Sequence, residues 1–226
     1  MLKFFKKNNY FYFSSADKIL KTPLNNAIMV ETERNARRLL KSLQTCIKSK
    51  NKEKVFFLEI LYFYYDLNKE NREFFIKKLI DNLNTDLLCY RANKNSELEE
   101  IQKKKWDPLL LFVKKKYKLS FKVANSIMPF NQDPKNILKL HKILKNLGSK
   151  KFTTYYFITN FSNSNIITLN FLLNNINSND VWDYLSLEET YNLSKWGYDE
   201  EAKSKLFEKK KYFDEIVNFK KLFNIQ

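Results

Sequence analysis

The segment SLEETYNLSKWGYDEEA, residues 186–202, decides how the second half of the chain is interpreted. It places five carboxylates in a 226-residue chain of formal net charge +16, and it holds one of only two glycines. Leucines and aromatic residues recur at helical spacing up to Gly197, which is suited to ending a helix. The pattern predicts a helix over 180–196 and a last helix over 199–223, with Asp199 as its N-cap.

The acids of this segment differ in how easily their positions are explained. Glu200 and Glu201 would lie in the first turn of the last helix, where the helix dipole favours negative charge. Glu188 and Glu189 have no such role, and they interrupt a helix that is apolar on two sides. Because an unpaired buried carboxylate is costly, each needs an internal ion pair, water or a partner protein. The residues alone leave these alternatives open.

The rest of the chain has a short β-rich start and a long helical remainder. Alternating residues over 10–30 predict two or three short strands with a turn at 23–26. Helical apolar spacing begins after Thr32 and recurs in the following ranges: 32–47, 54–65, 69–83, 151–162 and 166–176. The expected fold class is α+β, with a small β-rich part over 1–31 and a larger all-helical part over 32–226.

Proline and glycine positions predict further helix boundaries. Asp107-Pro108 and Asp133-Pro134 each place a capping acceptor before a proline suited to a first helical position, and Gly148 would close the second helix. The segment TDLLCYRA, 85–92, has no helical stripe and is expected to be a connector or a strand.

No catalytic or cofactor motif is present in the sequence. It has no P-loop, no GxGxxG, no GxSxG and no HExxH. The single histidine, His141, borders an apolar stripe, and Cys46 and Cys89 lack the spacing of a metal site. We therefore expect no metal, no cofactor and no enzymatic activity. No apolar run approaches the roughly 18 residues that a membrane span requires.

The basic charge suggests one alternative, a nucleic-acid-binding protein. Lysine and asparagine are both abundant, as is typical of an AT-rich coding sequence, and lysines are spread along the whole chain without a nucleic-acid-binding motif. Solvated lysine faces are therefore favoured over a nucleic-acid footprint. A hydrolase using Glu188 and Glu189 is a third class, but neighbouring helical residues point about 100° apart, which suits a convergent acid–base pair poorly.

The segment LSLEETYNLSKWGYDEEA resembles a motif of the ATP synthase assembly factor 2 family, the chaperone of the alpha subunit of the ATP synthase catalytic head. Four other segments agree with that family in its order: ILKTPLNNAIMVETE (19–33), NTDLLCYRA (84–92), WDPLLLFVKKKYKLSF (106–121) and SIMPF (126–130). The resemblance covers about residues 3–223. The strand sequence before the lysine-threonine-proline is shorter than is usual in the family.

The resemblance implies a chaperone that holds the unassembled alpha subunit until the hexamer forms, is monomeric when free and uses no cofactor. It places the partner-binding site first at Glu188 and then at these residues: Glu189, Tyr191, Trp196, Trp106 and Asp107. Because the similarity begins near Lys3, no room is left for a presequence, and a bacterial cytoplasm is the expected location. The mitochondrial matrix is the alternative.

Overall fold

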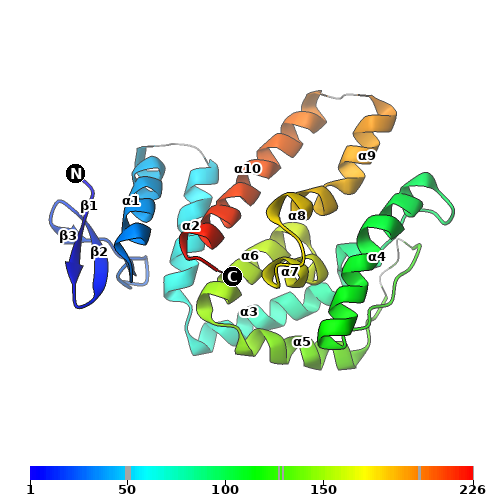
Figure 1. Cartoon of the computed structure of the whole chain (residues 1–226), viewed down its shortest axis with the longest axis horizontal. Helices are drawn as coiled ribbons and strands as arrows, with labels where there is room; N and C mark the ends of the chain where they lie inside the picture. Colours follow the sequence, from blue (N-terminus) through cyan, green and yellow to red (C-terminus); the bar gives the residue numbers. More distant parts are fainter. Residues whose placement is uncertain (49–51, 127, 129, 198–199, 226) are drawn as a thin grey trace. The chain divides into compact units, whose positions relative to one another are not determined.

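A four-stranded antiparallel sheet followed by ten α-helices makes up the part of the chain that the computed structural model describes (Figure 1). This architecture confirms the expected α+β class with mostly helical content. The described residues are 1–48, 52–126, 128, 130–197 and 200–225. Two compact units divide the chain. The first unit contains residues 1–68 and 214–225, and the second contains residues 69–213.

The sheet of the first unit is built around its second strand, which pairs antiparallel with each of the other three. Its strands are β1 (Lys3–Lys7), β2 (Tyr10–Ser15), β3 (Lys18–Ile19) and β4 (Met29–Val30). The expected turn is present, since the amide of Asn25 donates to the carbonyl of Thr22 at 2.9 Å. Phe13 of β2 is completely buried and anchors the sheet in the core of this unit.

Two helices and the end of a third complete the first unit. Helix α1 (Glu33–Lys48) begins at Thr32 as expected, because the Thr32 hydroxyl accepts from the amide of Asn35 at 3.3 Å. Its buried stripe includes Cys46, whereas Ile47, which ends the range of helical apolar spacing, is 62% exposed. Helix α2 (Lys52–Asp66) follows.

Aromatic rings join α2 to the end of α10 (Glu200–Leu222), the last helix of the chain. Tyr64 contacts Phe219 and Phe223, with ring centroids 5.7 and 4.9 Å apart. The buried Glu215 of the same helix forms an ion pair with Lys54. The end of α10 is therefore part of the core of the first unit.

The second unit is organised around a helix whose residues are all buried, α7 (Asn165–Leu172), which lies in the middle of this unit in Figure 1. Helices α4, α6 and α8 pack on it. Its buried polar side chains are hydrogen bonded, as burial requires; the Asn165 side chain, for example, accepts from the Tyr155 hydroxyl at 2.7 Å. The other helices of this unit are α3 (Lys69–Asp81), α4 (Glu97–Tyr117), α5 (Pro134–Asn146), α6 (Ser149–Ser162), α8 (Ser178–Leu185), α9 (Leu187–Trp196) and the first part of α10.

The TDLLCYRA segment, which the sequence left open as a connector or a strand, is a connector with a 3₁₀ turn at Leu87–Cys89, and a second 3₁₀ turn at Asn82–Thr85 leads into it. Asp86 lies between the turns, is completely buried and caps the start of α7. Its carboxylate accepts from the Ser164 hydroxyl at 2.8 Å and from the amide of Asn165 at 2.7 Å. Burial raises the pKa of Asp86 to about 6, although its hydrogen bonds oppose that rise.

The prediction that Asp107-Pro108 starts a helix is wrong, because both residues lie inside α4. The helix begins eleven residues earlier, where Ser96 caps the amide of Glu99 at 3.2 Å. Pro108 and Lys104, whose carbonyl loses its usual donor, are both exposed, so water can replace the missing bond. By contrast, Asp133 caps the first turn of α5 as expected.

The single helix predicted over 180–196 is two helices, α8 and α9, that meet at Ser186. The break separates the two tryptophans that a continuous helix would place on one stripe. Trp182 packs near Phe213, whereas Trp196 is 88% exposed. Gly197 follows α9 with a φ of +87°, as its expected stop role requires. The capping prediction for position 199 lies outside the described residues.

Gly148 follows the end of α5 as expected, but it does so without the left-handed conformation of a typical glycine stop. Its φ is −62°, and it serves as the first capping residue of α6. The sole histidine, His141, lies half-exposed beside the α5 core, and its Nε2 is 2.6 Å from the Glu73 carboxylate of α3. Its position at the boundary of the apolar stripe agrees with the expectation.

Candidate functional site

Helix α9 carries four of the six candidate residues and presents them on different sides. One side packs against α4. The other side borders a groove that it shares with the first part of α10. Glu188 and Glu189 are neighbours in sequence, but their hydrogen-bond partners belong to these two different helices.

Glu188 lies on the side that faces α4, where it is half-buried. Its Oε1 accepts a hydrogen bond of 2.7 Å from Nε2 of the buried Gln102, and the Gln102 side chain accepts in turn from the amide of Ala92 at 2.8 Å. Glu188 forms no ion pair with any described residue. Burial raises the pKa of Glu188, and the hydrogen bond from Gln102 opposes that rise. This carboxylate is therefore held by a neutral hydrogen-bond donor, and the Arg91 charge that favours its ionised form acts without an ion pair between them.

Trp106 and Asp107 lie next to this network through Arg91 of the connector. Trp106 is completely buried, and its Nε1 donates to the carbonyl of Tyr184 at 3.2 Å. The Arg91 guanidinium lies 5.1 Å from the Trp106 ring centre and donates to the Asp107 carboxylate at 2.9 Å. Arg91 is itself buried, and its Nε and Nη1 have no hydrogen-bond partner among the described residues. The pair expected to cap a helix instead fixes a buried arginine.

Tyr191 joins the outer edge of α9 to the start of α4. Its hydroxyl donates to Glu97 at 3.2 Å, and Lys195 forms an ion pair with the same carboxylate at 2.6 Å. These contacts lie at the exposed rim, where ion pairs contribute little stability. They mark the edge of α9 that faces the start of α4.

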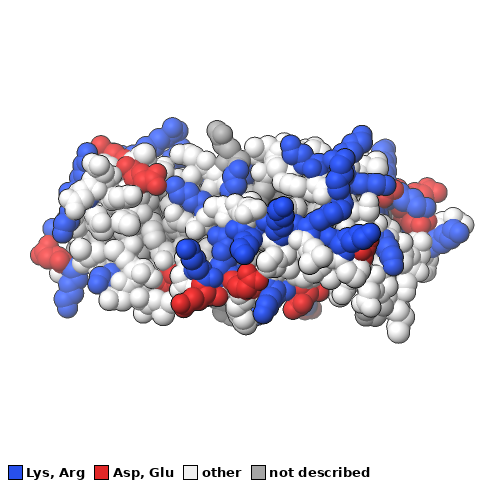
Figure 2. Space-filling model, turned by 90° about the horizontal axis from the view of Figure 1, so that it is seen from below, with Lys and Arg blue, Asp and Glu red and all other residues white. Residues whose placement is uncertain are grey.

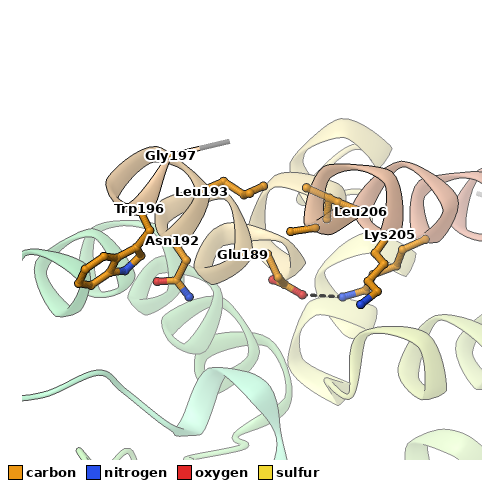
Figure 3. Close-up of a pocket in the computed structure, with 9 residues that line it drawn as sticks. Glu189, Asn192, Leu193, Trp196, Gly197, Lys205 and Leu206 are labelled. Carbon is orange, nitrogen blue, oxygen red and sulfur yellow. Dashed lines mark hydrogen bonds and ion pairs between the residues drawn. The ribbon is translucent and has the colours of Figure 1, made fainter. Parts of the chain in front are cut away.

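The groove between α9 and α10 has a volume of about 610 Å³. Leu193 of α9 and Leu206 of α10 point toward each other across it, and Trp196 extends from the end of α9 on the side away from α10 (Figure 3). Glu189 pairs with Lys209 at 2.8 Å at one edge. The groove is therefore an apolar channel with an ion pair at its border and an exposed indole at its end.

A smaller hollow of about 320 Å³ lies on the inner side of the same ion pair. Glu188, Glu189, Asn192 and Lys209 line part of it, and the last three also line the groove. The Glu189–Lys209 pair thus separates two hollows. For Glu189 the structure shows the internal ion pair that the sequence left open, whereas the hydrogen-bond partner of Glu188 is the neutral Gln102.

The structure gathers Glu188, Trp106 and Asp107 around Arg91, and places Glu189 and Trp196 at the groove. Sequence reasoning missed Gln102, Arg91, Lys209 and Leu206. Arg91 belongs to the quoted connector segment, but nothing in its position along the chain pointed to Trp106. Gln102 and Lys209 carry no sequence signal, because their role depends on which helices meet.

Other kinds of site have little support in the described part of the chain. Within residues 1–48, 52–126, 128, 130–197 and 200–225, no three His, Cys, Asp or Glu side chains are grouped so that they could hold a metal ion. No helix among these residues is long and apolar enough to cross a membrane.

Known proteins resemble the chain in both sequence and fold. The family model of the ATP12 chaperone protein matches residues 8–114. Atp12 from Paracoccus denitrificans has a TM-score of 0.81 at 19% identity, covering 99% of this chain and 95% of that chain. An aspartate-to-lysine mutant of that protein has the same TM-score and identity, with coverages of 99% and 94%. A protein from Agrobacterium tumefaciens proposed to be a chaperone has a TM-score of 0.83 at 19% identity, with coverages of 96% and 82%.

The two kinds of similarity support each other. The family match includes the segments at 19–33 and 84–92 and the tryptophan-aspartate-proline of 106–108, which carry the motif resemblance. The solved structures, at 19% identity, establish the fold over almost the whole chain, including the helices beyond residue 114. The chain is therefore similar to the ATP12 chaperone family, a family of ATP synthase assembly factors and not of enzymes, over residues 8–114, and it shares the fold of the solved Atp12 structures over almost its whole length.

Proposed function

We propose that this chain binds the unassembled alpha subunit of the F-type ATP synthase catalytic head and prevents its aggregation until the hexamer forms. The match of residues 8–114 to the assembly-factor family supports the chaperone role. The motif resemblance supports the alpha subunit as the client. The observation that carries the proposal is the apolar groove beside α9, with the exposed Trp196 at its end.

An open apolar groove suits a chaperone because an unassembled subunit exposes apolar surface that its neighbour will later cover. A tryptophan that is 88% exposed in the free protein gains most of its possible burial when a partner covers it. Leu193 and Leu206 offer apolar contact beside it. The Glu189–Lys209 pair at the border supplies polar atoms at the rim, where hydrogen bonds fix the orientation of a partner.

The buried candidates would act on binding indirectly. Trp106 is completely buried and Glu188 is half-buried, so neither offers a large contact surface. Trp106 of α4 holds the end of α8 through the Tyr184 carbonyl, and Glu188 holds the start of α9 against α4 through Gln102. We assign them a positioning role. Glu189 and Trp196 are assigned to direct contact with the client, and Tyr191 to the rim that orients α9.

We propose a bacterial cytoplasm as the place of this action, since the solved relatives come from two bacteria. The mitochondrial matrix is the alternative. The groove would act in the same way in both compartments.

Co-expression with the alpha subunit of the same organism tests the proposal. The soluble fraction is separated by size exclusion for wild type, Trp196→Ala, Glu188→Lys and Phe207→Ala. Phe207 is a matched control, because it is an exposed aromatic residue of α10 that does not line the groove. Circular dichroism and thermal unfolding establish that each variant is folded.

We expect wild type and Phe207→Ala to comigrate with the alpha subunit, and Trp196→Ala to lose at least about tenfold in affinity, as removal of an interface anchor typically does. Glu188→Lys places a cation in the network that already contains Arg91, so it should displace α9 and also lose the complex. Retention of the complex by folded Trp196→Ala would move the site away from the groove. Aggregation of the alpha subunit with wild type, as without it, would overturn the proposed function.

A further inference from the structure

The basic charge of the chain is concentrated in one stretch. Residues 108–179 contain eleven lysines, no arginine and a single acid, Asp133, so eleven positive charges less one give +10 of the total +16. The other 154 residues contain 30 basic and 24 acidic side chains, a net of +6. An AT-rich coding sequence explains many lysines along the chain. It does not explain why acids almost disappear from this stretch.

These lysines form a ridge on α5 and continue at the end of α4. Lys135, Lys142 and Lys145 recur at helical spacing on the side of α5 opposite its buried residues, with Leu138 between them. The ammonium group of Lys139 donates to the carbonyl of Lys118 at 2.6 Å, which places the last turn of α4 beside α5. Figure 2, which views the molecule from below, shows lysine side chains gathered over this part of the second unit. We call this surface the lysine face and define it by these residues: 114–116, 118, 122, 135, 138, 139, 142 and 145.

The charges of the lysine face are largely without partners in the described part of the chain; the exception is Lys145, which is near enough to Glu73 of α3 to help lower the pKa of that carboxyl. None of its lysines forms an ion pair with a described residue. The one acid of the stretch, Asp133, caps α5. On α3, which packs against α5, Glu73 is engaged by His141. Lysines around α9 and the first part of α10 behave differently, since the following all have carboxylate partners: 103, 195, 205, 209 and 211.

Unpaired lysines on one face are suited to a polyanion, and the details favour a lipid surface over a nucleic acid. The stretch lacks arginine, the residue that recognises phosphates and bases with two parallel hydrogen bonds. Its exposed large apolar residues are aliphatic, not the aromatic rings on which bases stack: Leu111, Val123, Met128 and Leu138. Lysines around an exposed aliphatic side chain are typical of proteins that bind the surface of an anionic bilayer.

We propose that the lysine face docks on the surface of a bilayer that contains anionic phospholipid, with Leu138, which is 72% exposed, entering the headgroup region. The headgroup phosphates would neutralise the lysines of α5 and of the last turn of α4. This interaction does not depend on the client proposed above. It would add a second binding surface, on helices other than α9 and α10, and would hold the chaperone at a membrane.

Co-sedimentation with vesicles tests this inference on the full chain. Vesicles of phosphatidylcholine alone are compared with vesicles that also contain phosphatidylglycerol, at several salt concentrations. The variant Lys135→Glu/Lys142→Glu/Lys145→Glu removes the ridge. The variant Lys7→Glu/Lys18→Glu/Lys41→Glu makes the same change in net charge at exposed lysines of the first unit. Circular dichroism verifies the fold of both.

We expect binding to the anionic vesicles only, with an affinity that falls as salt rises. Each lysine near an anionic surface raises the partition coefficient of a protein onto the vesicles about fivefold. The ridge variant should therefore bind at least about a hundredfold more weakly than wild type. The affinity of the control variant should fall much less. Leu138→Ser should lose severalfold. Absence of binding to anionic vesicles, or equal losses in the two triple variants, would overturn the inference. Equally tight binding of wild type to a DNA duplex, abolished by the ridge variant, would replace the lipid by a nucleic acid as the partner.

Discussion

The two sides of helix α9 face very different surroundings. Toward α4, Glu188 accepts from Gln102, whose side chain uses both its donor and its acceptor, and α4 itself contributes the completely buried Trp106. Toward α10, Glu189 pairs with Lys209 at the border of an open apolar groove, whose end is lined by the exposed Trp196. From residue type alone, Glu188 and Trp106 cannot be told apart from Glu189 and Trp196 in importance. Their surroundings separate residues that position the helix from residues that are free to contact a client.

This difference leads to opposite expectations for substitutions. A change on the α4 side should lower the free energy of unfolding. It should weaken the affinity for the client only indirectly, by displacing α9. A change on the groove side should leave stability nearly unchanged and should weaken binding directly. Each of the following substitutions is chosen to test whether the two sides separate in this way.

The largest effect is expected for Trp106→Ala. Removing a completely buried indole leaves a cavity and deprives the Tyr184 carbonyl of its donor, so the free energy of unfolding should fall by about 3–5 kcal/mol. Urea denaturation measures this loss. Trp196→Ala is the matched control and should change stability by less than about 0.5 kcal/mol, since Trp196 is exposed. Similar losses in the two variants would show that the sides do not differ in packing.

The second expectation concerns Asp86, the buried acid that caps α7. Its pKa in the folded state, about 6, lies above the ordinary aspartate value, so the folded state binds the proton more tightly than the unfolded state. The stability that this tighter proton binding contributes is fully present below the pKa of the unfolded state. It is lost as pH rises through about 6, where the folded protein releases the proton. Between pH 7 and pH 5, wild type should gain about 1–2 kcal/mol relative to Asp86→Asn. Thermal or urea unfolding at several pH values measures the difference, and parallel curves would contradict it.

The third expectation tests whether Leu206, an apolar residue that lines the groove, contacts the client. Leu206→Asp introduces a charge among apolar side chains that a client would cover, so affinity for the alpha subunit should fall by at least about tenfold. Leu206 is only half-buried, and the stability cost should stay near 1 kcal/mol. Phe207→Asp changes the next residue along the chain, which does not line the groove, and should bind normally. Size exclusion with titrated alpha subunit measures both.

How far the sequence could predict this arrangement depends on the kind of signal. Local chemistry was sufficient for the cap at Thr32, the start of α5 at Asp133-Pro134 and the end of α9 at Gly197, because each depends on a few adjacent residues. The same rule failed at Asp107-Pro108. There a stronger cap, Ser96 with Glu99 three residues later, had already started the helix, and the exposed proline could be accommodated within it.

The candidate site shows where prediction from sequence ends. The motif drew attention to Glu188 and Glu189, but their division between α4 and α10 depends on a helix break at Ser186 that changes the direction of the following residues. The contact of Arg91 with Trp106 joins positions fifteen residues apart through tertiary packing. Neither the helix break nor this contact produces a residue spacing that could be recognised in a single sequence.

The smallest effect is expected for Glu188→Gln, which removes the charge but keeps an oxygen that can accept from Gln102. Burial raises the pKa of Glu188 in the folded state, so its ionised form is disfavoured there. The glutamine variant should therefore be more stable at neutral pH, by less than about 1 kcal/mol, because solvent still screens a half-buried group. This gain should disappear as pH falls through the folded pKa, where the wild-type carboxyl is also neutral.

Binding by the same variant decides whether the α4 side only positions the helix. If Glu188 acts through the placement of α9, Glu188→Gln keeps the complex with the alpha subunit while Glu188→Lys loses it, because only lysine adds an unmatched charge beside Gln102. Size exclusion of the two co-expressed complexes measures this directly. If Glu188→Gln abolishes the complex as completely as Glu188→Lys does, the negative charge of Glu188 itself contacts the client. In that case the binding surface extends from the groove through the smaller hollow, which Glu188 and Glu189 both line.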